Sequence, residues 1–522
     1  MKPSFVCLAM SFSTITPDTP FISMSALVHE HALQRPENIA LIDEEQTLSY
    51  AQLDRLMDRV AASLQRDGLQ PGQAIAICAL NCVRYAALFL GALRAGVVVA
   101  PLAPSSTAES LASMLGDADA SHLFLDRAAQ DLRPADGGLK CIALDDAAGA
   151  QSFEDWLAPE GAKPQPVEVQ PAAPFNIIYS SGTTGTPKGI VQSHGMRWAH
   201  VNRGGIHGYS PEGTTVLATP LYSNTTLVVF FPTLGFGGRV ILMKKFDAAR
   251  YLQLAQQHRA THTMLVPVQY QRIMALAEFG EYDLSSFQAK FCTSAPFRAE
   301  LKADVLARWP GSLTEFYGMT EGGGTCTLDA REHPDKLHTV GKPVEGHDMR
   351  LIDEDGREVA PGEAGEVVGH SPSMMTGYHN QPEKTREAEW FDATGKRFIR
   401  TGDVGRFDAD GFLTLFDRRK DMIISGGFNI YPSDLEAQLR AHPQVEDVAV
   451  VGVPSEQWGE TPVAFVVSRA QQAGQPEEIM GWYNQRAGKT QRLADLRLVD
   501  ELPRSAIGKV LKRELREQYV KS

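Results

Sequence analysis

A loop rich in hydroxyl groups and glycine lies between Tyr179 and Gly189, where the sequence reads YSSGTTGTPKG. It directly follows the apolar run from Phe175 to Ile178, which predicts a strand. Hydroxyls, and backbone N–H groups that glycine leaves accessible, can hold phosphate oxygens. The candidate phosphate-binding residues are Ser181, Gly182, Thr183, Thr184, Gly185, Thr186 and Lys188. The spacing differs from the Gly-x-x-x-x-Gly-Lys-Ser/Thr loop of nucleotide hydrolases, so that mechanism is not implied. The alternative, a flexible linker, is disfavoured by the strand before the loop.

The composition is that of a globular protein with several domains. The chain has 522 residues, of which 43% are hydrophobic and 22% are charged. Its formal net charge of -13 argues against a general binder of nucleic acids or anionic membranes, because those surfaces attract basic proteins. An anionic nucleotide must therefore be held by local donors.

Cysteine usage and the start of the chain predict a cytoplasmic protein. The 6 cysteines are scattered, without Cys-x-x-Cys pairs or histidines at zinc-site spacing, which favours reduced thiols. No apolar run has the length of a membrane span, and the first residues make a poor secretion signal. Helical periodicity begins after Met24. We therefore expect residues 1–23 to be a disordered extension, unless Met24 is the true start.

Helix and strand patterns alternate in the first part of the chain. Apolar residues at helical spacing predict a helix that ends near Asp67-Gly68. These apolar residues are Leu53, Leu56, Met57, Val60 and Leu64. A second helix is expected over residues 81–96. Buried strands are expected at residues 74–80, 97–100, 122–126 and 141–145. This alternation predicts an α/β architecture with mostly parallel sheets.

From about Val340 the pattern changes to short alternating runs. Asp355-Gly356 and Asp410-Gly411 are turn signals typical of β-hairpins or a small barrel. The charged run 417–421 then interrupts the alternation and is a candidate hinge. Later patterns predict strands at 422–424, 445–453 and 463–467 and a helix from 432 to about 442, which would form a compact α+β domain. The expected division is a large domain over residues 24–416, a hinge over 417–421 and a small mobile domain over 422–522.

Five further motifs follow the loop in order. They read FYGMTE from Phe316, RTGD from Arg400, DRRKD from Asp417, SGG from Ser425 and PRSAIGK from Pro503. With the loop, this ordered set resembles the adenylate-forming superfamily of acyl-CoA synthetases, peptide-synthetase adenylation domains and luciferases, and within it the acyl- or aryl-CoA ligase branch. The resemblance runs from about residue 25 to the end of the chain. It implies a large N-terminal domain of layered α/β subdomains plus a small β-barrel-like region, followed by a small mobile α+β C-terminal domain.

The resemblance also implies an ATP site. In the family a carboxylate attacks the α-phosphorus of ATP, so two anions must meet, and cations and phosphate donors are required. The loop would hold the β- and γ-phosphates, Thr320 would contact the α-phosphate, and Glu321 would bind Mg²⁺, which prefers oxygen ligands. Tyr317 would lie against adenine, and Asp403 would accept hydrogen bonds from the ribose hydroxyls. The other residues implied for ATP or AMP binding are Ser294, Ala295, Gly318, Met319 and Arg418.

The small domain is expected to serve both half-reactions. Lys509 matches the family lysine that bridges the substrate carboxylate and the α-phosphate, and the alternative is a solvated lysine in a basic C-terminus. Lys420 aligns with the hinge position, about which the small domain of family members rotates. The residues implied for CoA binding are Gly426 and Gly427 in the pantetheine tunnel and Trp458 and Arg492 at the CoA nucleotide. The segment around Arg492 lacks the proline usual in this loop.

The acyl pocket is expected between the residues after Pro220, the region of Tyr317 and the helix after His194. Ser223 stands where many acyl- and aryl-CoA ligases carry a histidine and where amino-acid-activating domains carry an aspartate, so an α-amino acid is disfavoured. The glycines after Glu321 would leave a wall without side chains that admits a longer acyl group, or they serve a tight turn. The predicted pocket residues are Asn202, Ser223, Asn224, Gly323 and Gly324.

These observations predict ATP-dependent activation of a small or medium organic acid to its acyl adenylate, with release of pyrophosphate, and transfer of the acyl group to CoA. ATP, Mg²⁺ and CoA are the expected cofactors. Polar side chains that include Asn202, Arg203 and Thr225 could meet a hydroxyl, a carbonyl or a second carboxylate of the acid. The identity of the acid stays open, as does a homodimer. One alternative is transfer to the phosphopantetheine of a separate carrier protein. Another is a non-catalytic acyl or nucleotide sensor, which the intact Lys188 and Lys509 disfavour.

Overall fold

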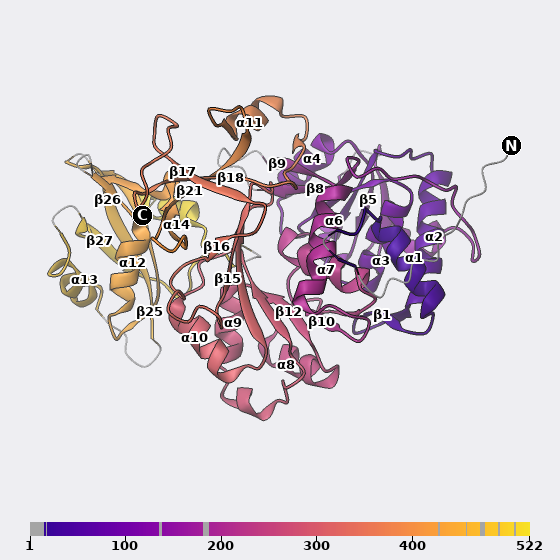
Figure 1. Cartoon of the computed structure of the whole chain (residues 1–522), viewed down its shortest axis with the longest axis horizontal. Coiled ribbons are helices and arrows are strands. Elements are labelled where there is room, and N and C mark those ends of the chain that lie inside the picture. Colours follow the sequence, from indigo (N-terminus) through magenta and orange to yellow (C-terminus); the bar gives the residue numbers. More distant parts are fainter. Residues whose placement is uncertain are drawn as a thin grey trace.

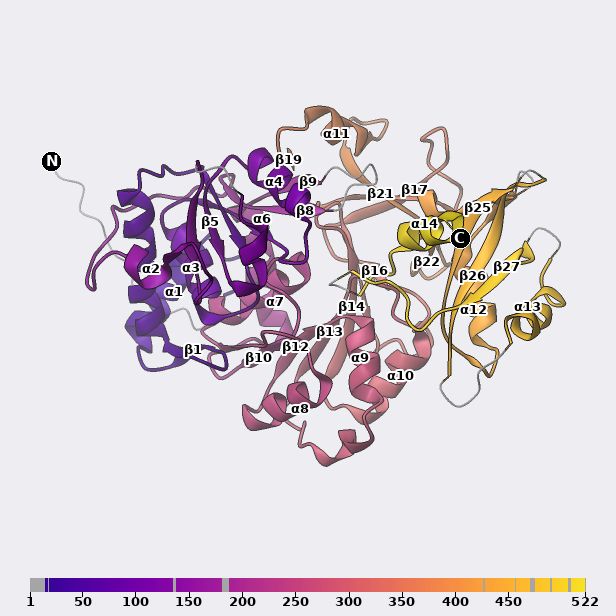
Figure 2. The ribbon, with the colours of Figure 1, turned by 180° about the vertical axis from the view of Figure 1, so that it is seen from behind.

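A computed structural model of the chain describes residues 15–16, 18–134, 138–180, 187–425, 428–455, 457–469, 475–488, 491–505 and 508–521. The N-terminal part lies at one end of the molecule and the C-terminal sheet at the other, with further sheets between them (Figures 1 and 2). Within the described residues, no helix has both the length and the apolar character needed to cross a bilayer.

An eight-stranded sheet with the order β19-β9-β8-β4-β3-β5-β6-β7 forms the first layer. Its strands from β8 to β7 are parallel, whereas β9 and β19 are antiparallel. The strands are β3 (Ala74–Cys78), β4 (Val98–Leu102), β5 (Ala120–Leu125), β6 (Lys140–Ala143), β7 (Gln151–Ser152), β8 (Pro174–Ser180), β9 (Lys188–Ser193) and β19 (Gly377–Tyr378). The intervening helices are α2 (Tyr50–Arg66), α3 (Val83–Arg94), α4 (Ala108–Asp117), η1 (Arg127–Leu132) and α5 (Phe153–Trp156). The strands and helices predicted for this part are confirmed.

Local sequence explains the bounds of α2. The Ser49 hydroxyl accepts a hydrogen bond from the Gln52 amide, and the Gln52 side chain accepts one from the Ser49 amide, which is a capping box. The helix ends before Gly68, which has a φ of 90° that L side chains rarely adopt. On its buried face α2 packs against α3, where a Cβ at Gly91 would lie 2.6 Å from Val60. The two helices can approach this closely because residue 91 has no side chain.

A nine-stranded sheet with the order β16-β15-β14-β13-β12-β10-β11-β1-β2 forms the second layer. Its central strands from β14 to β1 are parallel, and β2, β15 and β16 are antiparallel. The strands are β1 (Ile39–Ile42), β2 (Thr47–Ser49), β10 (Thr214–Leu217), β11 (Arg239–Leu242), β12 (His262–Leu265), β13 (Ala289–Cys292), β14 (Ser312–Gly318), β15 (Thr325–Asp329) and β16 (Lys342–Pro343). Its helices are α1 (Met24–Gln34), α6 (His194–Asn202), η2 (Arg203–His207), α7 (Asn224–Gly235), α8 (Ala248–Gln257), α9 (Pro267–Met274), η3 (Ala277–Glu281) and α10 (Ala299–Arg308). The carboxyl ends of the parallel strands share one edge, which is where ligands bind in such sheets.

Two smaller sheets complete the described chain. The first contains β17 (Asp348–Ile352), β18 (Gly365–His370), β20 (Glu389–Phe391), β21 (Arg397–Phe407) and β22 (Leu413–Arg418), with α11 (Pro382–Glu387) nearby. The second contains β23 (Ile423–Ser425), β24 (Phe428–Ile430), β25 (Val445–Ser455), β26 (Gly459–Ser468) and β27 (Asp495–Leu498), with helices α12 (Pro432–Arg440), α13 (Pro476–Asn484) and α14 (Lys512–Lys521). The short η4 (Arg419–Asp421) joins them. The predicted hairpin region and the predicted α+β domain are confirmed, and Gly356 and Gly411 adopt the left-handed backbone expected at their turns.

The prediction of a disordered extension over residues 1–23 is wrong for its last part. The Phe21 ring packs edge-on against His194 and Trp198, and the Trp198 ring nitrogen donates to the Thr19 carbonyl at 3.3 Å. Ile15 is buried against the main core. This short apolar segment therefore gains burial on the surface of α6 that its position before the first helix does not reveal. Residues 1–14 and Pro17 lie outside the described residues.

Candidate active site

The β8–β9 hairpin holds the predicted phosphate loop, with Ser180 at the end of β8 paired to Lys188 at the start of β9. The Lys188 ammonium nitrogen lies 4.9 Å from the centre of the Tyr378 ring, and the Tyr378 hydroxyl donates to Glu321 Oε1 at 2.9 Å. Lys188 and Glu321 therefore both contact Tyr378, the lysine at the ring and the glutamate at the hydroxyl. Sequence patterns missed Tyr378, since only the pairing of β19 with β9 brings it here. The loop residues Ser181, Gly182, Thr183, Thr184, Gly185 and Thr186 lie outside the described residues.

The predicted adenosine residues meet between β14 and the β21–β22 pair. The Tyr317 hydroxyl donates to Asp403 Oδ2 at 2.8 Å, and Arg418 Nε lies 3.3 Å from Asp403 Oδ1. Asp403 and Arg418 are direct partners in the β21–β22 register. Burial raises the pKa of Tyr317 and the Asp403 carboxylate adds to this effect, so the hydroxyl remains a donor at neutral pH. Tyr317, Asp403 and Arg418 thus form one polar group, although Tyr317 is far from the other two residues in the sequence.

The turn between β14 and β15 carries Thr320 and Glu321, and two contacts hold its backbone. The Gln192 side chain donates to the Thr320 carbonyl at 2.7 Å, and the Met375 amide donates to the Glu321 carbonyl at 2.8 Å. Met319 packs into a small cluster with Ile190 and other apolar side chains. The turn, which belongs to the second sheet, is therefore held by contacts from β9 and from the segment before β19 of the first sheet.

Two more predicted ATP residues, Ser294 and Ala295, follow the carboxyl end of β13. Ser294 has a φ of 82°, which is a strained backbone for a residue with a side chain. Its hydroxyl lies 2.6 Å from the Thr225 hydroxyl at the start of α7. Strain of this kind is typical of functional sites, where the surrounding structure holds it in place. Gly318 ends β14 beside this position, and a Cβ on it would lie 3.2 Å from Thr325 Oγ1.

The acidic side chains present fit a Mg²⁺ ion that is bound mainly by nucleotide phosphates. Among the described residues, no group of three histidine, cysteine or acidic side chains could hold a metal by itself. Mg²⁺ is commonly held by one or two carboxylates together with substrate phosphates. Glu321 has one carboxylate oxygen bonded to Tyr378, whose ring also contacts Lys188, so it is the group that would hold the ion.

Lys509 reaches this site from the small domain. The preceding Gly508 has a φ of 76°, and a Cβ on it would lie 2.9 Å from Val268 of α9, so the small domain touches the large one here. Lys509 is exposed at this boundary, but neighbouring protein atoms reduce the hydration of its ammonium group enough to lower its pKa to about 8. Arg418 lowers this pKa further, whereas Asp403 and Glu321 oppose the shift. The lysine therefore lies within electrostatic reach of both predicted ATP-site carboxylates.

The described residues that are predicted to bind CoA, Trp458 and Arg492, lie at the other end of the small sheet. Gly459, next to Trp458, pairs with Ser425, and Gly426 and Gly427 follow Ser425 but lie outside the described residues. Arg492 is exposed just before β27, whose parallel pairing with β26 places it near the same strand ends. Trp458, Arg492 and Ser425 therefore share one end of the sheet.

Charged residues around the predicted hinge tie it to the C-terminal helix. Lys512 lies 3.6 Å from Asp417, and Arg516 lies 3.1 Å from Asp421. Lys420 lies between these anchors with an exposed side chain. The two ends of the segment are thus held by α14, whereas Lys420 between them is exposed. Rotation of the small domain about this segment stays a prediction.

The residues predicted for the acyl pocket differ in their positions and in their hydrogen bonds. Ser223 is the N-cap of α7 and its hydroxyl accepts from the Thr225 amide at 3.3 Å, which gives it a structural reason to be serine. The Asn224 side chain accepts from Gln192 at 3.4 Å, and Asn202 ends α6. Ser223 and Asn224 lie at the carboxyl end of β10, whereas Asn202 lies at the start of η2.

The surroundings of the glycines after Glu321 favour a tight backbone turn over a wall left open for the acyl group. A Cβ at Gly323 would lie 2.6 Å from the Ile399 Cβ, and one at Gly324 would lie 2.2 Å from the Met349 sulfur. Gly322 and Gly324 also have positive φ values of 74° and 92°. A tight turn packed against β18 and β21 therefore requires these glycines, whatever their backbone presents to a substrate.

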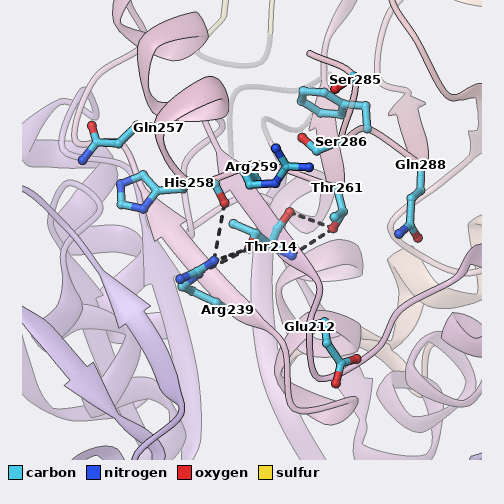
Figure 3. Close-up of a pocket in the computed structure, with 11 residues that line it drawn as sticks. Glu212, Thr214, Arg239, Gln257, His258, Arg259, Thr261, Ser285, Ser286 and Gln288 are labelled. Atoms are coloured by element: carbon cyan, nitrogen blue, oxygen red, sulfur yellow. Dashed lines mark hydrogen bonds between the residues drawn. The ribbon is translucent and has the colours of Figure 1, made fainter. Parts of the chain in front are cut away.

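A polar pocket of about 590 Å³ lies away from these motifs (Figure 3). Its lining includes Thr214 and Arg239, the first residues of β10 and β11, and Thr261 just before β12. The Arg239 guanidinium donates to the Thr214 hydroxyl at 2.9 Å and to the His258 carbonyl at 3.4 Å. The pocket therefore lies at the amino ends of the parallel strands, opposite to the predicted ATP site.

Comparison with known proteins agrees with this geometry. The AMP-binding enzyme family matches residues 28–379, and the C-terminal domain of AMP-binding enzymes matches residues 434–509. The chain belongs to the AMP-binding enzyme family. Feruloyl-CoA synthase from Amycolatopsis sp is 34% identical over 478 residues, which cover 90% of this chain and 94% of that protein. The fatty acid–[acyl-carrier-protein] ligase ScoC of Streptomyces coeruleorubidus is 30% identical over 510 residues, covering 94% and 95%. The crystal structure of ATP-bound MatB from Rhodopseudomonas palustris is similar with a TM-score of 0.84 and 29% identity, covering 95% of this chain and 99% of that one.

Proposed function

We propose that this AMP-forming acid–CoA ligase activates an organic acid with an aromatic or extended apolar body, using the residues described above. The observation that carries the proposal is that Lys509 of the small domain lies within electrostatic range of Asp403 and Glu321 of the large domain. A cation near a ribose-binding carboxylate and a metal-binding carboxylate suits the α-phosphate of ATP.

In the first half-reaction a carboxylate oxygen of the acid attacks the α-phosphorus. The new oxygen–phosphorus bond forms as the bond to the β-phosphate breaks, and pyrophosphate leaves. Lys509 would offset the charge that gathers on the acid and the α-phosphate, while the Thr320 hydroxyl donates to the α-phosphate. Mg²⁺, when bound, neutralises charge on the phosphates, and Glu321 would hold it.

In the second half-reaction the CoA sulfur attacks the acyl carbonyl carbon. A carbon–sulfur bond forms, the carbon–oxygen bond to AMP breaks, and the thiol proton is lost to solvent. Arg504 binds Asp447 at 2.5 Å and the Gly508 carbonyl at 2.7 Å, which fixes the Lys509 loop to one end of β25. Ser455, beside Trp458, ends the same strand. Eight residues at about 3.3 Å each separate Asp447 from Ser455 by roughly 26 Å.

This separation supports two arrangements of the small domain, with residues 422–522 turning about 417–421 against residues 24–416. In the arrangement described here the Lys509 end faces the ATP site, and a rotation would bring the Trp458 end to it. One rigid arrangement would leave one of the two ends far from the acyl group.

The proposed class of acid follows from a group of aromatic side chains in the large domain. The His207 ring packs edge-on against Phe291 at 5.1 Å and against Phe316 at 5.9 Å between ring centres. Phe316 and Tyr317 are consecutive in β14, so their side chains face opposite sides of that strand and the three rings lie on the side away from Tyr317. An acyl group that lay against this aromatic cluster would have a ring or an extended apolar chain, in keeping with a feruloyl-CoA synthase among the relatives.

A panel of carboxylic acids tested by pyrophosphate release, with and without CoA, checks the proposal. We expect release that depends on the acid, and acyl-CoA only when CoA is present. Absence of acid-dependent release across aromatic and aliphatic members would refute it. A carrier-protein acceptor is a second candidate because ScoC is a relative. Adding a phosphopantetheinylated carrier in place of CoA distinguishes the two acceptors.

A further inference from the structure

A cluster of basic side chains lies at the start of η2, beyond the aromatic rings. Arg203 Nη2 lies 3.2 Å from His347 Nε2 in the turn before β17. His200 stands one turn earlier on α6, and Arg197 and Arg203 are both close enough to lower its pKa. These side chains come from two segments that are about 150 residues apart in the sequence and converge at one place.

The cluster has positive charge without matching acids. Among the described residues, no carboxylate lies within ion-pair distance of Arg203 or Arg197. Arg197 is 1% exposed, donates to Asn176 and Gln192, and its Nη1 has no hydrogen-bond partner. Burial lowers the pKa of Arg203, which shows that water is partly excluded from its guanidinium. Two guanidinium groups in this setting leave a net positive potential that a bound anion would offset.

The two imidazoles of the cluster are also incompletely bonded. Burial lowers the pKa of His200 to about 3 and that of His347 to about 4, so both rings are neutral at pH 7. The Nδ1 atom of each ring is buried without a hydrogen-bond partner. Buried polar atoms of this kind are costly unless a ligand or water satisfies them.

The place of the cluster relates it to the acid. His207 ends η2, the element that Arg203 begins, and packs on Phe291 of β13. Phe291 lies three residues before Ser294, so the two residues are roughly 10 Å apart along the direction of β13. An acid that extends from Thr320 past these rings would therefore direct its far end toward η2.

We propose that Arg203 and His347, with His200 beside them, bind a second carboxylate at the far end of the acid, so that the substrate is a dicarboxylic acid with an apolar or aromatic middle. The inference rests on the proposed function and names the substrate class of that site. A carboxylate is favoured over a hydroxyl because a planar guanidinium binds it through two parallel hydrogen bonds and because only an anion offsets the charge.

The test compares cinnamate, 4-hydroxycinnamate and 4-carboxycinnamate in ATP–pyrophosphate exchange, since the three differ only at the far end. We expect the carboxy acid to exceed cinnamate in kcat/KM by about tenfold or more, as a charge-assisted hydrogen bond would give. In Arg203→Gln this ratio should fall to near one, and Arg203→Lys should keep part of it. Arg239→Gln is the matched control, because Arg239 is also a half-buried arginine but lies at the opposite strand ends (Figure 3).

Preference for cinnamate or 4-hydroxycinnamate in the wild type, or an unchanged ratio in Arg203→Gln, would overturn the proposal. Thermal melting confirms that each variant is folded, and His347→Gln gives a second variant that should lower the same ratio. If neither these acids nor the wider panel supports exchange, the proposed function fails, and calorimetric binding of 4-carboxycinnamate to wild type and Arg203→Gln then decides the carboxylate site by itself. Equal binding to both would refute it.

Discussion

The lowered pKa of Lys509 predicts how adenylation depends on pH. With a pKa of about 8, roughly nine-tenths of the lysine is protonated at pH 7 and roughly one-tenth at pH 9. Only the protonated form carries the charge that the acid and the α-phosphate need. The kcat/KM for adenylation should therefore fall about tenfold between pH 7 and pH 9, and the loss should occur as pH rises through 8.

Two substitutions separate this effect from other alkaline losses. Lys509→Arg keeps a positive charge throughout this range, so its profile should lose the fall near pH 8 even if its rate is lower. Lys509→Ala removes one preorganised charge and should lower adenylation by about 10²- to 10³-fold at pH 7. It should leave thioester formation from a supplied acyl adenylate and CoA nearly unchanged, because Lys509 faces the ATP site only in the arrangement described here.

The assay is ATP–pyrophosphate exchange from pH 6 to pH 10, alongside single-turnover thioester formation from the synthetic adenylate. Lys521→Ala, at the exposed end of α14, is the control for removing a lysine from this domain. The reasoning fails if Lys509→Arg shows the same fall near pH 8 as the wild type. It also fails if Lys509→Ala slows both half-reactions equally.

Three further predictions follow from other contacts. Asp403→Asn removes the charge that faces Arg418 and should raise the KM for ATP about tenfold with a smaller effect on kcat, whereas Asp410→Asn on an exposed turn should not. Lys302→Met leaves the buried Glu315 carboxylate without its ion-pair partner and should lower the free energy of unfolding in urea by about 3–5 kcal/mol, with partial recovery in the double variant that also carries Glu315→Gln. Lys420→Pro fixes φ at the hinge and should slow one half-reaction much more than the other, and equal slowing would contradict the hinge.

Local patterns were sufficient for most elements, and they mark the residues predicted for the ATP half of the site. The periodicity of α2 and the alternation of β25 and β26 depend on neighbouring residues, so they are visible in the sequence. Tyr317, Asp403 and Lys509 each lie in a short motif whose resemblance to a family places them. The packing of Phe21 on α6 was missed because a few apolar residues before a helix give no periodic signal.

The rest of the site depends on contacts between distant segments. Tyr378 reaches Glu321 only because β19 pairs with β9, and Arg197 lies buried only because α6 packs its face against Phe175 and Phe231. In the sequence both are ordinary residues without a motif. The direction of a missing side chain is equally hidden, which is why the sequence leaves both interpretations of Gly323 open, whereas in the structure Ile399 occupies that direction.

Arg197 and Arg203 are two basic positions that would have different consequences for the proposed catalysis. Arg197 donates to Gln192, and Gln192 donates in turn to the Thr320 carbonyl, so this arginine supports the turn that carries Thr320. A change at Arg197 should therefore alter the rate with every acid. Arg203 lies outside that chain of hydrogen bonds, and its only polar contact recorded in the described part of the molecule is His347. In the proposed dicarboxylate site, recognition of the far end of the acid would therefore vary at Arg203 while Thr320 stays in place, which would separate the choice of acid from the chemistry that activates it.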